Sequence, residues 1–236
     1  MEQLKKALAQ LNIHVDEKML HQFNNYMEQI LSWNEKVNLT AIKDPDEFIK
    51  KHYVDSVLCA NYDEIAGAKT VIDVGTGAGF PGIPLALIFP EKHFLLIDSL
   101  DKRIKIIKEI CQAIEIRNVE AVHGRAEELA FQQKYRQQFD LCVSRAVAKL
   151  PVLAEYCLPF VKIGGFFLSY KGPDTEDERF QAKKALKALG GELIEERKAN
   201  LEGFDLNHTL LVMKKTQNTP AKYPRKSGIP SKKPLI

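Results

Sequence analysis

The spacing of the hydrophobic residues changes about 65 positions into the chain. Before that point, apolar residues recur every three or four positions, as they do on one face of an amphipathic helix. One such stripe joins Leu4, Leu8 and Leu11, and a second begins at Met19. The pattern predicts a helical N-terminal cap over residues 1–65 without strands.

From there on, short apolar runs alternate with amphipathic stretches, which predicts strands separated by helices and therefore a parallel sheet covered on both faces. The expected strands are 70–74, 93–98, 119–123, 139–144, 164–170, 191–199 and 205–215. The last two are close together in the chain, so we expect them to pair as an antiparallel hairpin. The result is an α/β, Rossmann-like fold of about seven strands over residues 66–215. Its closing hairpin is typical of class I methyltransferases.

The stretch "VIDVGTGAGFPGIP", residues 71–84, lies where a predicted strand turns into a helix. Gly75, Gly77 and Gly79 remove side chains there, and exposed N–H groups at a helix N-terminus favour a polar or anionic ligand group. The pyrophosphate of a dinucleotide and the methionine part of S-adenosylmethionine both fit. Residues 77–82 match the dinucleotide-binding pattern G-x-G-x-x-G, but Pro81 lies inside that match. This proline, together with Asp73 before the first glycine, favours S-adenosylmethionine over a dinucleotide.

Asp98 follows Gly75 by 23 residues, at the end of the next predicted strand. Its carboxylate is suited to both ribose hydroxyls of either cofactor, so it does not separate a methyltransferase from a nicotinamide-dependent reductase. The intact glycines and Asp98 speak against a third reading, a non-catalytic RNA-binding protein with a degenerate loop.

Composition narrows the class of protein further. With 45% hydrophobic and 28% charged residues, the chain is typical of a soluble globular protein. Its longest apolar stretch, Phe80–Phe89, has ten residues and two prolines, which is too short for a membrane span, and no secretory signal precedes it. The four cysteines have apolar neighbours and form no CxxC pair. We therefore expect a cytoplasmic protein with reduced core cysteines and no metal.

Charge is unevenly distributed along the chain. Residues 214–236 contain seven Lys or Arg and no acid, and the rest has four more acids than bases. A basic, proline-rich tail over residues 216–236 predicts a polyanionic partner, most simply nucleic acid, although a tail that serves only solubility has the same composition. The alternative function is a methyltransferase with a small-molecule acceptor. Binding a small acceptor would not require the positive charges of the tail.

The acceptor atom determines which catalytic groups are needed. Exocyclic amines are usually held by an Asn/Asp-Pro-Pro-aromatic turn after the fourth strand, which here reads "VSRAVAKLP". Carbon-5 of a pyrimidine needs a cysteine nucleophile, and Cys142 and Cys157 lack the Pro-Cys turn that presents one. Guanine N7 has an in-plane lone pair and no proton, so proximity and orientation can suffice. We expect no catalytic acid or base, which is compatible with an N7 acceptor.

Several long motifs resemble the bacterial methyltransferases that modify guanine N7 in 16S ribosomal RNA, the family once called glucose-inhibited division protein B. The motifs are "WNEKVNLTAI" (33–42), "HYVDS" (52–56), "DVGTGAGFPGIPLA" (73–86), "LIDSLDKRIK" (96–105), "HGRAEEL" (123–129), "SRAVAKL" (144–150) and "YPRKSGIPSKKPL" (223–235). The resemblance implies S-adenosylmethionine as cofactor, 7-methylguanosine as product, and 16S rRNA or the small ribosomal subunit as partner.

The resemblance also implies roles for single residues around the cofactor. Gly75 and Phe80 would line it, Gly77 and Gly79 would shape the loop, Asp98 would bind the ribose, Ala126 and Glu127 would contact the adenine, and Arg145 would border cofactor and substrate. The residues themselves agree in two places. "GRAEEL" follows the third strand, where an adenine-binding turn is expected, and an Arg at a strand's carboxyl end suits a phosphate or guanine O6.

The substrate side is less determined. Lys171, just after the fifth strand, is a second candidate there, with an ordinary surface lysine as the alternative. Asn38, His52 and Asp55 either belong to the site or hold the cap against the sheet. The expected phosphate contacts of the tail are Arg225, Lys226, Lys232 and Lys233. We expect a monomer, and we expect loss of the tail to weaken RNA binding while leaving cofactor binding nearly intact.

Overall fold

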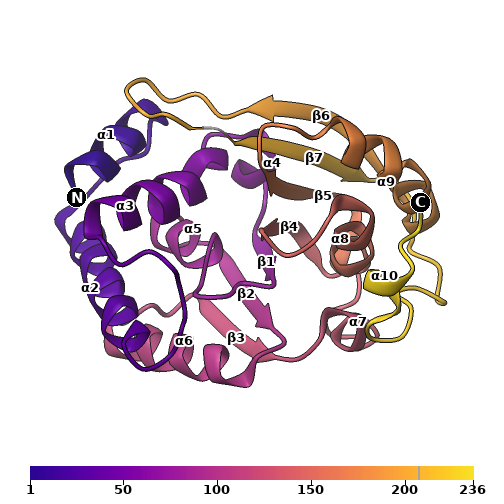
Figure 1. Ribbon diagram of the computed structural model, residues 1–236, viewed down its shortest axis with the longest axis horizontal. Helices are drawn as coiled ribbons and strands as arrows, with labels where there is room; N and C mark the ends of the chain where they lie inside the picture. The colour runs from indigo at the N-terminus through magenta and orange to yellow at the C-terminus, as the bar shows by residue number, and fades with distance from the viewer. Residues whose placement is uncertain (207) are drawn as a thin grey trace.

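The computed structural model describes residues 1–206 and 208–236. At its centre is a seven-stranded sheet of order β3-β2-β1-β4-β5-β7-β6 (Figure 1). The strands are β1 (Thr70–Val74), β2 (His93–Asp98), β3 (Val119–His123), β4 (Phe139–Arg145), β5 (Val161–Lys171), β6 (Gly191–Lys198) and β7 (Thr209–Lys215). Only β7 runs antiparallel to its neighbours, β5 and β6. The predicted sheet and its closing antiparallel pair are confirmed. The last strand was expected over residues 205–215 but begins at Thr209, and residue 207 of that prediction lies outside the described residues.

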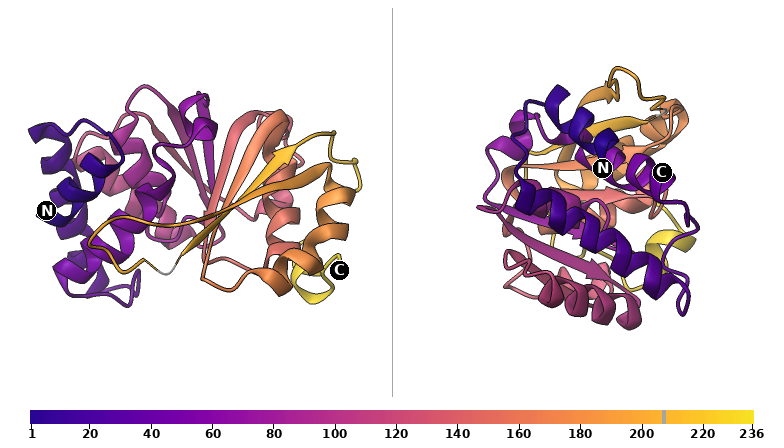
Figure 2. Two further views of the ribbon diagram at one scale, coloured as in Figure 1. Left: turned by 90° about the horizontal axis from the view of Figure 1, so that it is seen from above. Right: turned by 90° about the vertical axis from the view of Figure 1, so that its left-hand side faces the viewer.

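Helices cover both faces of the sheet, as the left view of Figure 2 shows. Those on one face are α1 (Glu2–Gln10), α2 (Glu17–Asn34), α5 (Gly82–Ile88) and α6 (Asp101–Ala113). Those on the other are α7 (Ala126–Leu129), α8 (Leu150–Cys157), α9 (Glu176–Leu189) and α10 (Ile229–Lys232). Successive strand residues point to opposite faces, so Val71 joins the first core and Ile72 the second.

Within the predicted helical cap, residues 46–62 do not form the one continuous helix expected after Pro45. They divide into α3 (Pro45–Phe48), a π-helical turn (Ile49–Val54) and a 3₁₀ turn (Val57–Cys59), before α4 (Asp63–Ala66). Every residue from 53 to 60 is buried, which no one-sided amphipathic helix allows. The irregular turns distribute these side chains around the chain, so the segment is enclosed by the rest of the protein.

The N-terminal cap shares its hydrophobic core with the sheet. Leu8, Phe23 and Tyr53 of the cap belong to the same cluster of buried side chains as Val71 and Leu141 of the sheet. This continuity fixes the cap relative to the carboxyl ends of the strands, where the candidate site lies.

The C-terminal segment also lies against the body, near α7 and α8 in Figure 1. The Arg136 guanidinium donates hydrogen bonds to the carbonyl groups of Thr219, Pro220 and Tyr223, at 3.0 to 3.2 Å. Lys215 is fully buried, and its ammonium donates to the carbonyl oxygens of Leu158 and Leu189. The basic segment is therefore an integral part of the fold over most of its length.

Two further features concern the class of protein. All four cysteines are buried and unpaired, as their apolar neighbours suggest. Across residues 1–206 and 208–236, no helix combines the length and the apolar character that crossing a membrane requires.

Candidate active site

The order of the strands reverses between β1 and β4, and in such sheets a crevice opens at the carboxyl ends of these strands. A hollow of about 120 Å³ lies at this place. Gly75, Asp98, Ala126 and Glu127, four of the predicted cofactor residues, are part of its lining. The fold therefore brings together residues from three separate turns that the sequence singled out.

The glycine loop has a backbone that other residues adopt with difficulty. Gly75, Gly77 and Gly79 have φ angles of 75°, 61° and 88°, in the left-handed region. A Cβ at Gly79 would overlap the Tyr26 hydroxyl, and one at Gly75 would overlap the Val147 side chain. A Cβ at Gly77 would meet nothing within 4 Å. Two of the glycines permit close packing, and Gly77 leaves space open.

Asp73 organises this loop from beneath. Its carboxylate is fully buried, and Oδ2 accepts hydrogen bonds from Thr76 Oγ1 at 2.7 Å and from the Gly82 N–H at 2.9 Å. Burial raises the pKa of Asp73 to about 7. In these contacts Asp73 accepts hydrogen bonds from the loop and from the start of α5. A direct contact with the cofactor stays a prediction.

Asp98 connects the end of β2 to the glycine loop. Its Oδ2 accepts from the Gly77 N–H at 2.9 Å and its Oδ1 accepts from the Leu100 N–H at 2.8 Å. The side chain is 5% exposed, and Arg103 lies 3.5 Å from it. The carboxylate thus lines the hollow, and the ribose contact expected of it stays a prediction.

Phe80 and Arg145 meet on the side of the site that faces the cap. The Phe80 ring stacks on His52, with centroids 4.4 Å apart, and the Arg145 guanidinium lies 5.5 Å from the same ring. Arg145 also donates to Asp55 and, at 3.2 Å, to the Lys51 carbonyl. His52 and Asp55 therefore do hold the cap against the sheet, and they do so through a predicted site residue.

Asp55 carries a second partner that the sequence did not suggest. His208, just before β7, places Nδ1 2.9 Å from Asp55 Oδ1. Burial alone would raise the pKa of Asp55, but the nearby His208 ring and the charge of Arg145 lower it. Burial and the Arg145 charge lower the pKa of His52 to about 4. Asn38, by contrast, is exposed.

Lys171 is 11% exposed and is not an ordinary surface lysine. Its ammonium donates to the Ala148 carbonyl at 2.8 Å and pairs with Glu178 at 2.7 Å. Glu178 in turn accepts from the Leu150 N–H at 2.8 Å. Lys171 thereby fixes the loop that follows β4 and borders the site.

The tail residues fall into two groups. Arg225 forms an ion pair with the fully buried Glu155, with Nη2 2.7 Å from Oε2, whereas Lys226, Lys232 and Lys233 are exposed. The tail also reaches the hollow, because the Gly228 N–H donates to Glu127 Oε1 at 3.0 Å. This contact speaks against the expected independence of tail and cofactor site.

The family model described as GidB, rRNA small subunit methyltransferase G, matches residues 19–201. The chain belongs to this family. A relative from Alkaliphilus metalliredigens, "Ribosomal RNA small subunit methyltransferase G", is 47% identical over 98% of this chain and 97% of its own. A relative of the same name from Clostridium novyi is 47% identical over 99% and 96%.

Solved structures share the fold at much lower identity. An O-methyltransferase family protein from Burkholderia thailandensis gives a TM-score of 0.57 at 15% identity, covering 73% of this chain and 58% of its own. A ribosomal protein L11 methylase from Lactobacillus delbrueckii subsp. bulgaricus gives 0.53 at 16% identity, covering 71% and 80%. Both similarities support a class I methyltransferase fold for this chain.

Other chemistry has little support in the described residues. Cys142 and Cys157 are fully buried, and burial raises the pKa of the Cys142 thiol well above its ordinary value, so neither presents a thiolate to a pyrimidine. Within residues 1–206 and 208–236, no group of three His, Cys, Asp or Glu side chains is placed to hold a metal ion.

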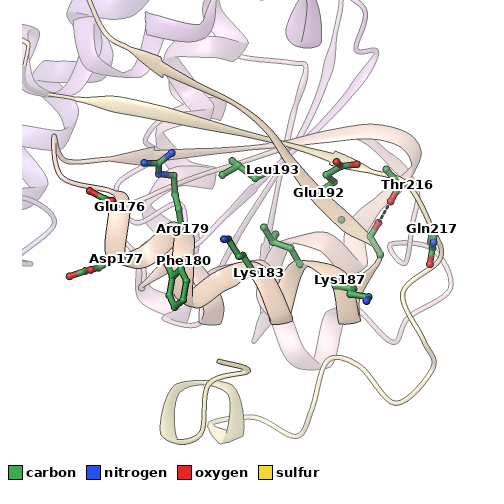
Figure 3. Close-up of a pocket in the computed structure, with 13 residues that line it drawn as sticks. Glu176, Asp177, Arg179, Phe180, Lys183, Lys187, Glu192, Leu193, Thr216 and Gln217 are labelled. Carbon is green, nitrogen blue, oxygen red and sulfur yellow. Dashed lines mark hydrogen bonds between the residues drawn. The ribbon is translucent and has the colours of Figure 1, made fainter.

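A cavity of about 820 Å³ lies elsewhere, between α9 and the start of β6 (Figure 3). Charges of both signs line it, among them Glu176, Arg179 and Lys183, together with the apolar Phe180 and Leu193. Because none of the predicted site residues lines this cavity, we do not assign it as the active site.

Proposed function

We propose that the protein is an S-adenosylmethionine-dependent methyltransferase that modifies N7 of a guanine in 16S rRNA. The observation that carries this proposal is the hollow at the carboxyl ends of β1 and β4, where the glycine loop, Asp98 and the Ala126–Glu127 turn converge. Full-length similarity to relatives named rRNA small subunit methyltransferase G supports the same substrate class.

The residues present fit the cofactor in kind. Backbone N–H groups of the glycine loop would hold the methionine part, Asp98 the ribose, and Ala126 with Glu127 the adenine. The hollow of about 120 Å³ is smaller than the ~300 Å³ at the lower end of small-ligand pockets, because the Val147 side chain lies against Gly75. Binding would therefore move Val147 outward.

The side chains around the site suit a reaction that needs orientation more than proton transfer. S-adenosylmethionine, when bound, supplies an electrophilic methyl group. Guanine N7 carries no proton, so no base is required. With its pKa near 4, His52 is uncharged at neutral pH, and Asp73 is enclosed beneath the loop. Arg145 is held by Asp55 at the boundary between cofactor and acceptor. The chain's contribution is to position both reactants in a dry site.

The exposed Lys226, Lys232 and Lys233 would contact RNA phosphates, each with a salt-sensitive and sequence-independent attraction. Arg225 was expected to do the same, but its pairing with Glu155 gives it an internal role that competes with phosphate binding. Because the proposed substrate is ribosomal RNA, we propose that the protein acts in the cytoplasm. We also propose that it acts as a monomer.

Methyl transfer from radiolabelled S-adenosylmethionine to small ribosomal subunits that lack the modification tests the proposal. After nucleoside digestion, label should be found in 7-methylguanosine. Label in another nucleoside would overturn the N7 assignment. No label, with cofactor binding demonstrated by calorimetry, would favour the small-molecule acceptor.

A further inference from the structure

A second hollow lies beside the cofactor site, at the carboxyl ends of β4 and β5. It has a volume of about 180 Å³, room for on the order of six water molecules. Its lining is Arg145, Ala146, Tyr170, Lys171, Gly172 and His208. Ala146 lines this hollow, and the next residue, Val147, lines the cofactor hollow. Consecutive residues of the loop after β4 therefore line the two hollows, so an acceptor in one would lie next to a methyl donor in the other.

The side chains of this second hollow are rich in hydrogen-bond donors. Arg145 and Lys171 carry positive charge, and the His208 ring offers nitrogen atoms. Among nucleobases, guanine presents two acceptors, O6 and N7, on the edge that must face the methyl donor. Adenine presents a donor, its amino group, in place of O6. A donor-rich hollow therefore favours guanine, provided that one donor reaches O6 and leaves N7 free.

His208 lines this hollow beside Asp55. Its Nδ1 lies 2.9 Å from Asp55 Oδ1, an ion-pair contact when the ring is protonated although no hydrogen bond forms between the two atoms, and Nε2 lies on the other side of the ring. The ring is 39% exposed, whereas Asp55 is 3% exposed. Arg145 is already committed to Asp55 and Lys51, and Lys171 to Ala148 and Glu178. When its ring is protonated, His208 carries a proton on Nε2 that it can donate into the hollow.

We propose that the hollow beside Arg145 receives the acceptor guanine and that His208 Nε2–H donates a hydrogen bond to guanine O6, which makes His208 a specificity-determining residue. Asp55 is its positioning residue, because one carboxylate orients both His208 and Arg145. The proposal rests on the proposed function and adds to it the pocket and the contact that select the base.

The first experiment compares His208→Ala with wild type on unmodified small subunits. KM for the subunit should rise roughly 10- to 100-fold, the usual loss for a hydrogen bond to a charged donor, while Kd for S-adenosylmethionine stays unchanged. Tm should fall, because the buried Asp55 loses one of its two cationic partners. His21→Ala, at an exposed histidine on α2, is the matched control and should behave as wild type. Equal kinetics for both variants, or a loss of cofactor affinity in His208→Ala, would overturn the proposal.

The second experiment removes the other partner of the hydrogen bond. Subunits assembled with 2-aminopurine at the modified position retain N7 but lack O6. Wild type should lose activity on them by a factor similar to the His208→Ala effect, and His208→Ala should show little additional loss. If wild type accepts 2-aminopurine as well as guanine, His208 contacts a phosphate or no RNA at all, and the proposal fails.

A pH profile separates this role from a merely structural one. Asp55 raises the pKa of His208, whereas Arg145 lowers it, and Lys171 is the other charged group lining the same hollow. Activity of the wild type should fall as pH rises through the ring's pKa, and His208→Ala should lack that fall. If wild type transfers no methyl group to any subunit, the proposed function itself fails, which is a different result from a wild-type-like His208→Ala.

Discussion

Arg225→Ala is expected to destabilise the protein far more than a typical surface substitution. Arg225 donates through its backbone N–H and its guanidinium to both oxygens of Glu155, at 2.7 to 3.2 Å. The Glu155 side chain is fully buried, so the variant leaves a carboxylate with neither water nor its cationic partner. Removing one member of a buried ion pair costs about 3–5 kcal/mol.

For a chain of this size, 1 kcal/mol lowers Tm by roughly 2–4 °C, so Arg225→Ala should lower it by about 10 °C. Differential scanning calorimetry and urea unfolding measure the change. Lys226→Ala is the matched control, because this neighbouring lysine is exposed and should change the free energy of unfolding by less than about 0.5 kcal/mol.

The double variant Arg225→Ala/Glu155→Gln completes a cycle and should recover part of the loss, because the buried charge is gone. Identical stabilities for Arg225→Ala and Lys226→Ala would refute the reasoning. They would show that the tail leaves the body readily, that Glu155 then gains water, and that Arg225 is available to RNA as its sequence context suggested.

Three further predictions concern the loop, a buried lysine and the tail. Gly77→Leu should bind S-adenosylmethionine at least about tenfold more weakly in calorimetry. Its Tm should fall only as much as the cost of a left-handed φ, about 1–2 kcal/mol, requires, because its Cβ meets nothing within 4 Å. Gly79→Leu, which would also overlap Tyr26, should lower Tm more strongly. A wild-type affinity for Gly77→Leu would contradict the loop assignment. Burial lowers the pKa of Lys215 to about 7, so between pH 7 and 9 the unfolded chain binds more protons and the free energy of unfolding should rise with pH. In urea unfolding measured at several pH values, Lys215→Met should reduce the rise of the free energy of unfolding with pH. If the variant shows the same pH dependence as wild type, the rise comes from other titratable groups. Removal of residues 216–236 should weaken both cofactor and RNA binding, because Glu127 loses the Gly228 N–H, and it should also lower Tm, because the buried Glu155 loses Arg225. Intact cofactor affinity of the truncated chain, measured by calorimetry well below its Tm, would restore the independence of tail and cofactor site.

The sheet could be predicted because its information is local. Each strand is a short apolar run. The glycine loop can be located from the sequence because its glycines are the residues that adopt a positive φ most easily. The segment around residues 53–60 could not be predicted, since its consecutive buried side chains have no single periodicity. The partner of Asp55 was missed for a different reason. His208 follows it by 153 residues, and one histidine before a strand carries no signal until the sheet places β7 beside β5.

Composition divides the chain into a helical cap, a sheet and a basic tail, but the contacts at the site cross these divisions. Tyr26 of the cap donates to the Ala78 carbonyl and supports the glycine loop. Asp55 of the cap holds Arg145, and Gly228 of the tail holds Glu127. The sheet supplies the ends of strands, and the two flanking segments fix the side chains that stand on them. RNA bound to the exposed face of the tail would therefore contact a segment whose inner face holds Glu127 at the cofactor hollow. The affinities for RNA and cofactor should then be coupled, so that each ligand raises the affinity for the other by the same factor.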